Sequence, residues 1–230
     1  MEHTRETVII LDFGGKYAQM VARRVREAQV YCELLSCKTK WEEILQRQPK
    51  AIILSGGPSG IFIDNAPACD ERIFDGNVPV LAIGYGMQLM VKSLGGEVKS
   101  GSKRESGPVD LFVDMDRRLF QGLDKKIIAF MNTGDCLAKL PKGFEVLAHT
   151  EETPFAAVGN GNNLYGIQFH PEESRTVGGH EILNNFLFGI AGCNGTWSMK
   201  AFIQDQIRLI REQAGVRQVI CGLSGGVDSS

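Results

Sequence analysis

The sequence predicts an α/β fold: a doubly wound, mostly parallel open sheet with helices on both faces, plus a smaller antiparallel sheet. Three observations support this. In the first 95 residues, apolar runs of strand length alternate with segments of helical periodicity. Glycine-rich loops follow the runs at residues 50–54 and 78–83, where a parallel sheet presents its binding loops. Later, short apolar runs are joined by turn residues, as is typical of antiparallel strands.

The first half of the chain provides the parallel strands. Residues 7–13 form the first expected strand, and the following helix has an apolar face made of Tyr17, Met20, Val21, Val25 and Ala28. Strands at residues 30–35 and 50–54 flank a short helix at residues 41–47. Right-handed crossovers make such strands parallel, so the loops after their carboxyl ends should share one edge of the sheet.

Gly84 lies at the sharpest turn that the sequence predicts. An apolar run at residues 78–83 precedes it, and Leu89, Met90 and Leu94 recur behind it at helical spacing. A strand, a tight turn and a helix form a nucleophile elbow when the turn carries a reactive side chain. The residue at such a turn is usually held at positive φ, which glycine adopts without a Cβ clash. Glycine has no side chain, however, and cannot act as a nucleophile.

The second half of the chain predicts antiparallel strands near residues 109–114, 126–131 and 144–148, then a hairpin of residues 155–158 and 164–168. This hairpin places His170 and Glu172 at a strand end. A helix follows at residues 179–190, and a glycine-rich break at residues 191–195 predicts a domain boundary.

Two domains are therefore expected, at residues 1–193 and 194–230. In the second, an amphipathic helix with Phe202, Ile203, Ile207 and Ile210 facing inward precedes a strand at residues 218–223. The last loop reads Ser-Gly-Gly-Val-Asp-Ser-Ser, and a domain cannot end on its first strand and loop. We expect the second domain to be truncated.

Composition excludes several classes of function. The net charge of −2 gives no global field that would favour a nucleic acid polymer or an anionic membrane. No apolar run is long enough to span a bilayer, and the N-terminus lacks a signal peptide, so we expect a cytoplasmic protein. The six cysteines and four histidines show no metal-ligand spacing, which predicts buried thiols and no metal.

Two motifs indicate chemistry. The loop of residues 55–60, Ser-Gly-Gly-Pro-Ser-Gly, is either a flexible turn or a loop whose backbone N–H groups bind an oxyanion. The pair His170 and Glu172 is either a surface histidine beside a carboxylate, or a general base with the group that orients it. The elbow at Gly84 favours the functional interpretation of both.

These motifs together resemble the class I (triad) glutamine amidotransferases, which have a flavodoxin-like sheet, and among them the GMP synthetases. The elbow Ala-Ile-Gly-Tyr-Gly-Met-Gln (residues 82–88) matches the family pattern except at Gly84, where the family has its catalytic cysteine. Gly-Ile-Gln-Phe-His-Pro-Glu (residues 166–172) matches the family's His/Glu motif. Asp-Phe-Gly-Gly (residues 12–15) and Lys-Arg-Glu (residues 103–105) add to the likeness, and the last loop is similar to the pyrophosphate loop of ATP pyrophosphatases.

The resemblance implies a function and a set of site residues. Such a domain hydrolyses glutamine to supply ammonia for the ATP-dependent amination of XMP to GMP, with no cofactor in this domain and Mg-ATP in the second. It leaves open a homodimer. The implied residues are the catalytic Gly84 (the nucleophile position), His170 and Glu172; the oxyanion-hole residues Gly57 and Tyr85; the glutamine-binding residues Gln88, Thr133, Gly134 and Asp135; and the pyrophosphate loop Ser224, Gly225, Gly226, Val227, Asp228, Ser229 and Ser230.

The departures from the family pattern cluster around the implied glutamine site. Besides Gly84, Ser106 replaces a usual aromatic residue, and Thr133 and Arg175 replace frequent histidines. Glutaminase activity should therefore be very low, and the chain is alternatively a silent binding or regulatory module of an ammonia-dependent synthetase. Cys136 is the nearest other thiol in sequence, but it is not at an elbow. A related anthranilate or carbamoyl-phosphate amidotransferase is disfavoured by the last loop, and whether Gly84 is natural or engineered stays open.

Overall fold

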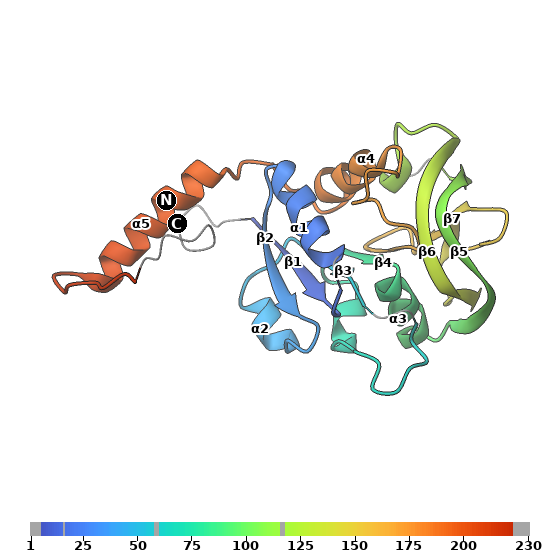
Figure 1. Ribbon diagram of the computed structural model, residues 1–230, viewed down its shortest axis with the longest axis horizontal. Helices are drawn as coiled ribbons and strands as arrows, with labels where there is room; N and C mark the ends of the chain where they lie inside the picture. Colours follow the sequence, from blue (N-terminus) through green and yellow to red (C-terminus); the bar gives the residue numbers. More distant parts are fainter. Residues whose placement is uncertain (1–5, 16, 58–59, 116–117, 223–230) are drawn as a thin grey trace. The chain divides into compact units, whose positions relative to one another are not determined.

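The computed structural model describes residues 6–15, 17–57, 60–115 and 118–222 (Figure 1). The chain divides into two compact units, Met1–Thr196 and Trp197–Ser230. The break lies next to the glycine-rich region where the sequence predicts a boundary, and each unit is described separately. The pyrophosphate-like loop at residues 224–230 lies outside the described residues.

One nine-stranded mixed sheet forms the centre of the first unit, in the order β2-β1-β3-β4-β9-β8-β7-β5-β6. Its parallel part consists of β2 (Tyr31–Ser36), β1 (Thr7–Asp12), β3 (Ala51–Ser55), β4 (Val80–Ile83) and β9 (Leu164–Ile167). The antiparallel part consists of β8 (Ala157–Gly159), β7 (Glu145–His149), β5 (Glu97–Val113) and β6 (Lys126–Lys139). The predicted α/β class is confirmed, but the sheet is mixed rather than mostly parallel, since four of the eight strand pairings among the described residues are antiparallel.

The antiparallel strands do not form a separate sheet, which corrects one detail of the prediction. β8 pairs with β9 in register, so the antiparallel strands continue the parallel sheet. β5 begins at Glu97 rather than near residue 109, and β6 runs on to Lys139. The glycines and charged residues of residues 95–107 obscured this long strand, because they interrupt the alternation that marks a strand in sequence.

Helices cover both faces of the sheet. On one face, Val8 and Ile10 pack with α1 (Tyr17–Glu27) and with the C-terminal helical segments α4 (Gly179–Asn184) and η3 (Asn185–Ile190, a π-helix). On the other, Ile9 and Leu11 pack with α2 (Trp41–Leu45), η1 (Glu71–Phe74) and α3 (Tyr85–Ser93). A further turn, η2 (Arg118–Phe120), precedes β6. Successive side chains of a strand point to opposite faces, so β1 alone contributes to both cores.

The second unit contains one described helix, α5 (Met199–Ala214), whose first turn is capped by Ser198 Oγ accepting from Ala201 N at 3.2 Å. The expected inward face is not buried within this unit: Ile203, Ile207 and Ile210 are all exposed. The strand expected at residues 218–223 is also wrong, since residues 218–222 form no strand. Across the described residues, no helix is long and apolar enough to cross a membrane.

Candidate active site

The elbow is formed as the sequence predicts. Gly84 connects β4 to α3 with φ +56° and ψ −111°, so the expectation of positive φ is confirmed. Its N–H donates to Ile167 O at 2.8 Å, and its carbonyl accepts from Met87 N and Gln88 N at 3.1 and 3.3 Å. These bonds join the tip of the turn to β9 on one side and to the first turn of α3 on the other. The backbone that would present a nucleophile is therefore held from both sides.

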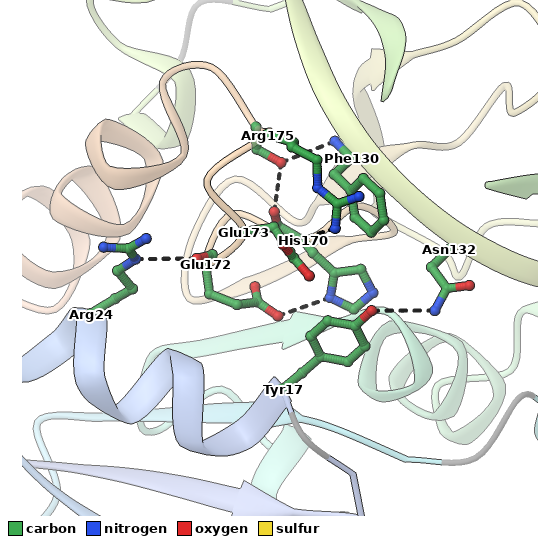
Figure 2. Close-up of polar contacts among 9 residues, drawn as sticks. Tyr17, Arg24, Phe130, Asn132, His170, Glu172, Glu173 and Arg175 are labelled. Atoms are coloured by element: carbon green, nitrogen blue, oxygen red, sulfur yellow. Dashed lines mark hydrogen bonds and ion pairs between the residues drawn. The ribbon is translucent and has the colours of Figure 1, made fainter. Parts of the chain in front are cut away.

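A histidine–carboxylate pair faces the elbow. His170 Nδ1 lies 2.9 Å from Glu172 Oε1 (Figure 2), and their side chains are only 8% and 0% exposed. The backbone of His170 is held by its N–H to Phe130 O at 3.0 Å and by its carbonyl, which accepts from Thr176 Oγ1 at 2.6 Å. Arg24 Nε donates to Glu172 O at 3.1 Å. The segment that carries the pair is thus tied to β6 and to α1.

The other edge of the His170 ring is directed at position 84. A Cβ built on Gly84 would lie 3.7 Å from His170 Cε1 and 3.9 Å from Nε2. In the part of the chain that the structure describes, apart from the neighbours of Gly84 in the chain and its helix, no other heavy atom lies within 4 Å of that point. Nδ1 is bound to Glu172, so Nε2 is the nitrogen that a nucleophile attached at position 84 would meet. A cysteine at position 84 would complete a Cys-His-Glu triad with His170 and Glu172. The catalytic role of these three positions stays a prediction.

Tyr17 packs against His170 and was not predicted as a site residue. Its ring stacks on His170 with centroids 4.0 Å apart at 19°, and its hydroxyl accepts from Asn132 Nδ2 at 3.5 Å (Figure 2). The sequence assigned Tyr17 only to the apolar face of a helix. Its position at the start of α1, directly after the carboxyl end of β1, was the available signal.

Gly57 and Tyr85, the two residues predicted for the oxyanion hole, are in contact. Gly57 has φ +114°, and a Cβ on it would lie 2.6 Å from Tyr85 Cγ, so the loop after β3 contacts the first residue of α3. Tyr85 is buried and donates its hydroxyl to Pro67 O at 2.6 Å. Burial is the main cause that raises the pKa of Tyr85 to about 12. The helix N-terminus favours negative charge here, while the oxyanion role of these two residues stays a prediction.

The implied glutamine-binding residues form one buried polar network. Asp135 O accepts from Gln88 Nε2 at 3.3 Å and from Thr133 Oγ1 at 2.6 Å, and Asp135 Oδ2 accepts from Ile61 N at 3.2 Å. Gln168, which the sequence did not single out, donates from Nε2 to Thr133 Oγ1 at 3.0 Å. Gly134 lies within β6 between Thr133 and Asp135.

Two buried oxygens of this network, Gln88 Oε1 and Gln168 Oε1, have no hydrogen-bond partner among the described residues. Buried acceptors are normally paired, so a bound polar group would satisfy them. Both oxygens are enclosed by the protein, so pairing with a ligand would require the network to open. The assignment of that ligand as glutamine stays a prediction at this point.

The departures from the family pattern are accommodated without strain in the contacts. Thr133 is integrated into the polar network, and Ser106 pairs in register with Asn132 across β5 and β6. The Arg175 guanidinium lies 3.7 Å above the Phe130 ring, and its Nη2 donates to Glu173 Oε2 at 3.1 Å (Figure 2). Thr133, Ser106 and Arg175 thus each have defined partners in this structure.

Among the described residues, no other side chain provides the missing thiol. Cys136 is partly buried on β6, which is the edge strand, where it pairs in register with Lys99 rather than at the elbow. Burial raises the pKa of Cys69 to about 12 and that of Cys32 and Cys193 to about 11, so these thiols stay protonated at neutral pH. No group of three or more histidine, cysteine, aspartate or glutamate side chains suited to a metal was found in the described residues.

Comparison with known proteins assigns the family. The sequence model for "Glutamine amidotransferase class-I" matches residues 9–190. The chain is 51% identical over 224 residues to a GMP synthase [glutamine-hydrolyzing] of Carboxydothermus hydrogenoformans, covering 97% of this chain and 44% of that protein. It is 47% identical over 227 residues to the GMP synthase [glutamine-hydrolyzing] of Nostoc punctiforme, covering 98% and 42%. The chain thus spans less than half the length of these relatives.

Solved structures agree on the fold. A protein of Thermoplasma acidophilum described as a GMP synthase component superposes with a TM-score of 0.73 at 24% identity, covering 90% of this chain and 100% of that one. A glutamine amidotransferase of Thermotoga maritima gives a TM-score of 0.62 at 19% identity, covering 93% and 91%. The elbow, the buried His170–Glu172 pair, the nine-stranded sheet and these matches lead to one conclusion: the chain belongs to the class I glutamine amidotransferases and is homologous to the amidotransferase part of GMP synthases.

Proposed function

We propose that this chain is the amidotransferase domain of a GMP synthetase in which the covalent route of glutamine hydrolysis has been lost. In such an enzyme the domain supplies ammonia to a second domain, which uses Mg-ATP to aminate XMP. The relatives named GMP synthase [glutamine-hydrolyzing] support this assignment. The loss of the covalent route is inferred from Gly84, which stands at a fully formed elbow with His170 Nε2 directed at it.

The loss is expected to be severe because the reaction depends on a covalent intermediate. In the family's chemistry a thiolate attacks the carboxamide, a thioester forms, and His170 would first take the thiol proton and then give it to ammonia. Removing one member of a triad leaves only the rate that binding and the oxyanion hole provide. We expect glutaminase activity several orders of magnitude below that of a relative with cysteine at this position.

A second function, a silent binding or regulatory module, is supported by the polar network around Asp135. Gln88, Thr133 and Gln168 remain buried and hydrogen-bonded, with two unpaired acceptors among the described residues. A chain that binds glutamine without hydrolysing it could make a synthetase that uses free ammonia respond to the concentration of glutamine. Binding and turnover are therefore separable properties of this site.

Two measurements on the same preparation test the proposal. Ammonia release from glutamine should be at or near background, and a turnover near 1 per second, in the usual range of enzymes, would contradict the missing covalent route. Calorimetric titration with glutamine should show saturable binding that is lost on Asp135→Ala. Glutamate and asparagine serve as matched ligands, and a chain that binds none of the three would refute the binding module.

A further inference from the structure

We propose that the His170–Glu172 pair remains active as a base and hydrolyses activated acyl compounds with water, rather than a side chain, as the nucleophile. The inference rests on the same site as the proposed function, but not on its specificity for glutamine. It starts from the fact that only one of three triad groups is missing. The other two retain their geometry, at 2.9 Å, and their burial.

His170 is held in one orientation as the base. Glu172 accepts from His170 Nδ1–H in the tautomer that leaves Nε2 as the basic nitrogen. Tyr17 stacks on one face of the ring at 4.0 Å and limits its rotation. The backbone bonds of His170 to Phe130 and Thr176 fix the segment. A base held in this way is positioned whether or not a thiol is present.

The base faces the point where a Cβ on residue 84 would stand. The point where a Cβ would stand is 3.9 Å from His170 Nε2, so a cysteine sulfur one bond from that point would lie beside the line to the nitrogen, at hydrogen-bond distance from it in a suitable χ1 rotamer. A water molecule that occupies the place of the sulfur is within hydrogen-bond reach of Nε2. Tyr85, whose backbone N–H opens α3, follows Gly84 directly in the chain, and its side chain contacts the loop of Gly57. Base, nucleophile and oxyanion donors would therefore meet at the same place.

The reaction is balanced without any further reagent. The water oxygen forms a bond to the acyl carbon as His170 Nε2 takes one water proton, and the carbonyl π electrons move to oxygen. The tetrahedral intermediate then collapses, breaks the bond to the leaving group and yields a carboxylic acid. A phenolate leaves without a proton, and the imidazolium returns its proton to solvent. An amide nitrogen must receive that proton before it leaves, so activated esters should react much faster than glutamine.

The experiment measures hydrolysis of p-nitrophenyl acetate by the whole chain. His170→Ala should lower the rate by roughly 10²-fold, the low end of what a positioned base contributes. His149→Ala is the matched control, because His149 forms a pair of nearly the same length with Asp114 but is exposed. Its rate should equal that of the parent. Equal rates for the parent and His170→Ala would overturn the proposal.

A second variant tests the place of the water. Gly84→Ala puts a methyl group where it excludes water from the position of the sulfur, so the rate should fall at least severalfold while the His170–Glu172 pair remains. A denaturant melt confirms that the variant is folded under the assay conditions. A Gly84→Ala protein as fast as the parent would place the nucleophile elsewhere and contradict the proposal.

The nucleophile itself is identified by two further readouts. General-base catalysis by His170 predicts slower hydrolysis in D₂O and no acetyl group retained on the protein by intact mass spectrometry. A rate independent of D₂O, or an acetylated protein that forms and decays with turnover, would show that a side chain attacks and would overturn the proposal. Glutamine binding, measured separately, stands or falls with the proposed function alone.

Discussion

Two histidine–carboxylate pairs of almost equal length occur among the described residues, and they differ in their surroundings. His170 and Glu172 are 2.9 Å apart with side chains 8% and 0% exposed, while His149 and Asp114 are 2.8 Å apart with side chains 42% and 36% exposed. Both imidazoles stack on an aromatic ring, Tyr17 for His170 and Phe112 for His149. The distance between the histidine and the carboxylate therefore does not identify a catalytic site. Burial and the elbow opposite Nε2 distinguish His170.

The largest expected difference between the pairs is in catalysis once a thiol is supplied. In the Gly84→Cys background, adding His170→Ala should lower glutaminase activity by about 10³-fold, because the thiol loses its base and ammonia its proton donor. Adding His149→Ala instead should leave the rate within about twofold, since surface substitutions away from a site rarely act on it. Ammonia release checks both. A double variant with His170→Ala that is as active as Gly84→Cys would mean that the pair is only structural.

The next difference is in stability. His170→Ala removes the hydrogen-bond partner of a fully buried carboxylate whose other oxygen, Oε2, already has no partner among the described residues. This should cost about 1–3 kcal/mol of the free energy of unfolding. His149→Ala removes an exposed pair, whose loss should cost less than about 1 kcal/mol. Urea melts of the parent and both variants compare them, and equal losses would show that burial does not separate the two pairs.

A similar comparison of two glycines sharpens the account of the elbow. Gly84→Ala or Gly84→Cys should destabilise the chain by roughly 0.5–2 kcal/mol, because φ is +56° and a side chain there is strained even with room for its Cβ. Gly189 is the control: it lies in η3 without positive φ, and a Cβ on it would meet nothing within 4 Å. Gly189→Ala should be neutral or slightly stabilising.

If Gly84→Ala proved more stable than the parent while Gly189→Ala was neutral, the turn would not be strained. The predicted cost of a side chain at position 84 would then be wrong, even though φ there is positive as expected. Structures of both variants show whether the backbone at position 84 keeps its conformation.

The smallest expected effect concerns an exposed ion pair. Hydrogen bonds from Arg72 lower the pKa of Asp70 to about 2, below its ordinary value of 3.8. A carboxyl with a lower pKa in the folded state adds stability above its unfolded value, and that contribution is lost as pH falls from about 4 to about 2. The pair is exposed, so the loss should stay under about 1 kcal/mol. Urea melts of the parent and Asp70→Asn between pH 5 and pH 2 measure it, and identical pH dependence would contradict it.

The parallel half of the fold could be predicted because strands buried on both faces appear in the sequence as continuous apolar runs. The runs at β1, β3 and β4 are apolar almost throughout, since both of their faces are covered. β5 carries glycine, lysine and arginine within a single 17-residue strand, and only its pairing with β6 shows that it is one element. Register shifts between the two strands have no signature in a single sequence.

The residues of the site also fall into two groups: those that belong to a local sequence motif and those that do not. Gly84, His170 and Glu172 were predicted as site residues because each belongs to a motif with fixed local geometry. Tyr17 and Gln168 act across long distances in sequence, on His170 and Thr133, and no local pattern marks a residue for a contact with a partner so far along the chain. The last loop lies outside the described residues, so its role as a pyrophosphate loop stays a prediction.

The central claim is that this chain keeps the elbow and the histidine–glutamate pair of a glutaminase and lacks its nucleophile. The most direct measurement is ammonia release from glutamine by the parent and by Gly84→Cys, with the intact mass of each protein recorded during turnover. The account predicts background activity for the parent, and for Gly84→Cys an increase of about 10³-fold or more with a glutamyl thioester on the protein. Rapid glutamine hydrolysis by the parent, or a Gly84→Cys protein that forms no thioester and releases no ammonia, would contradict it.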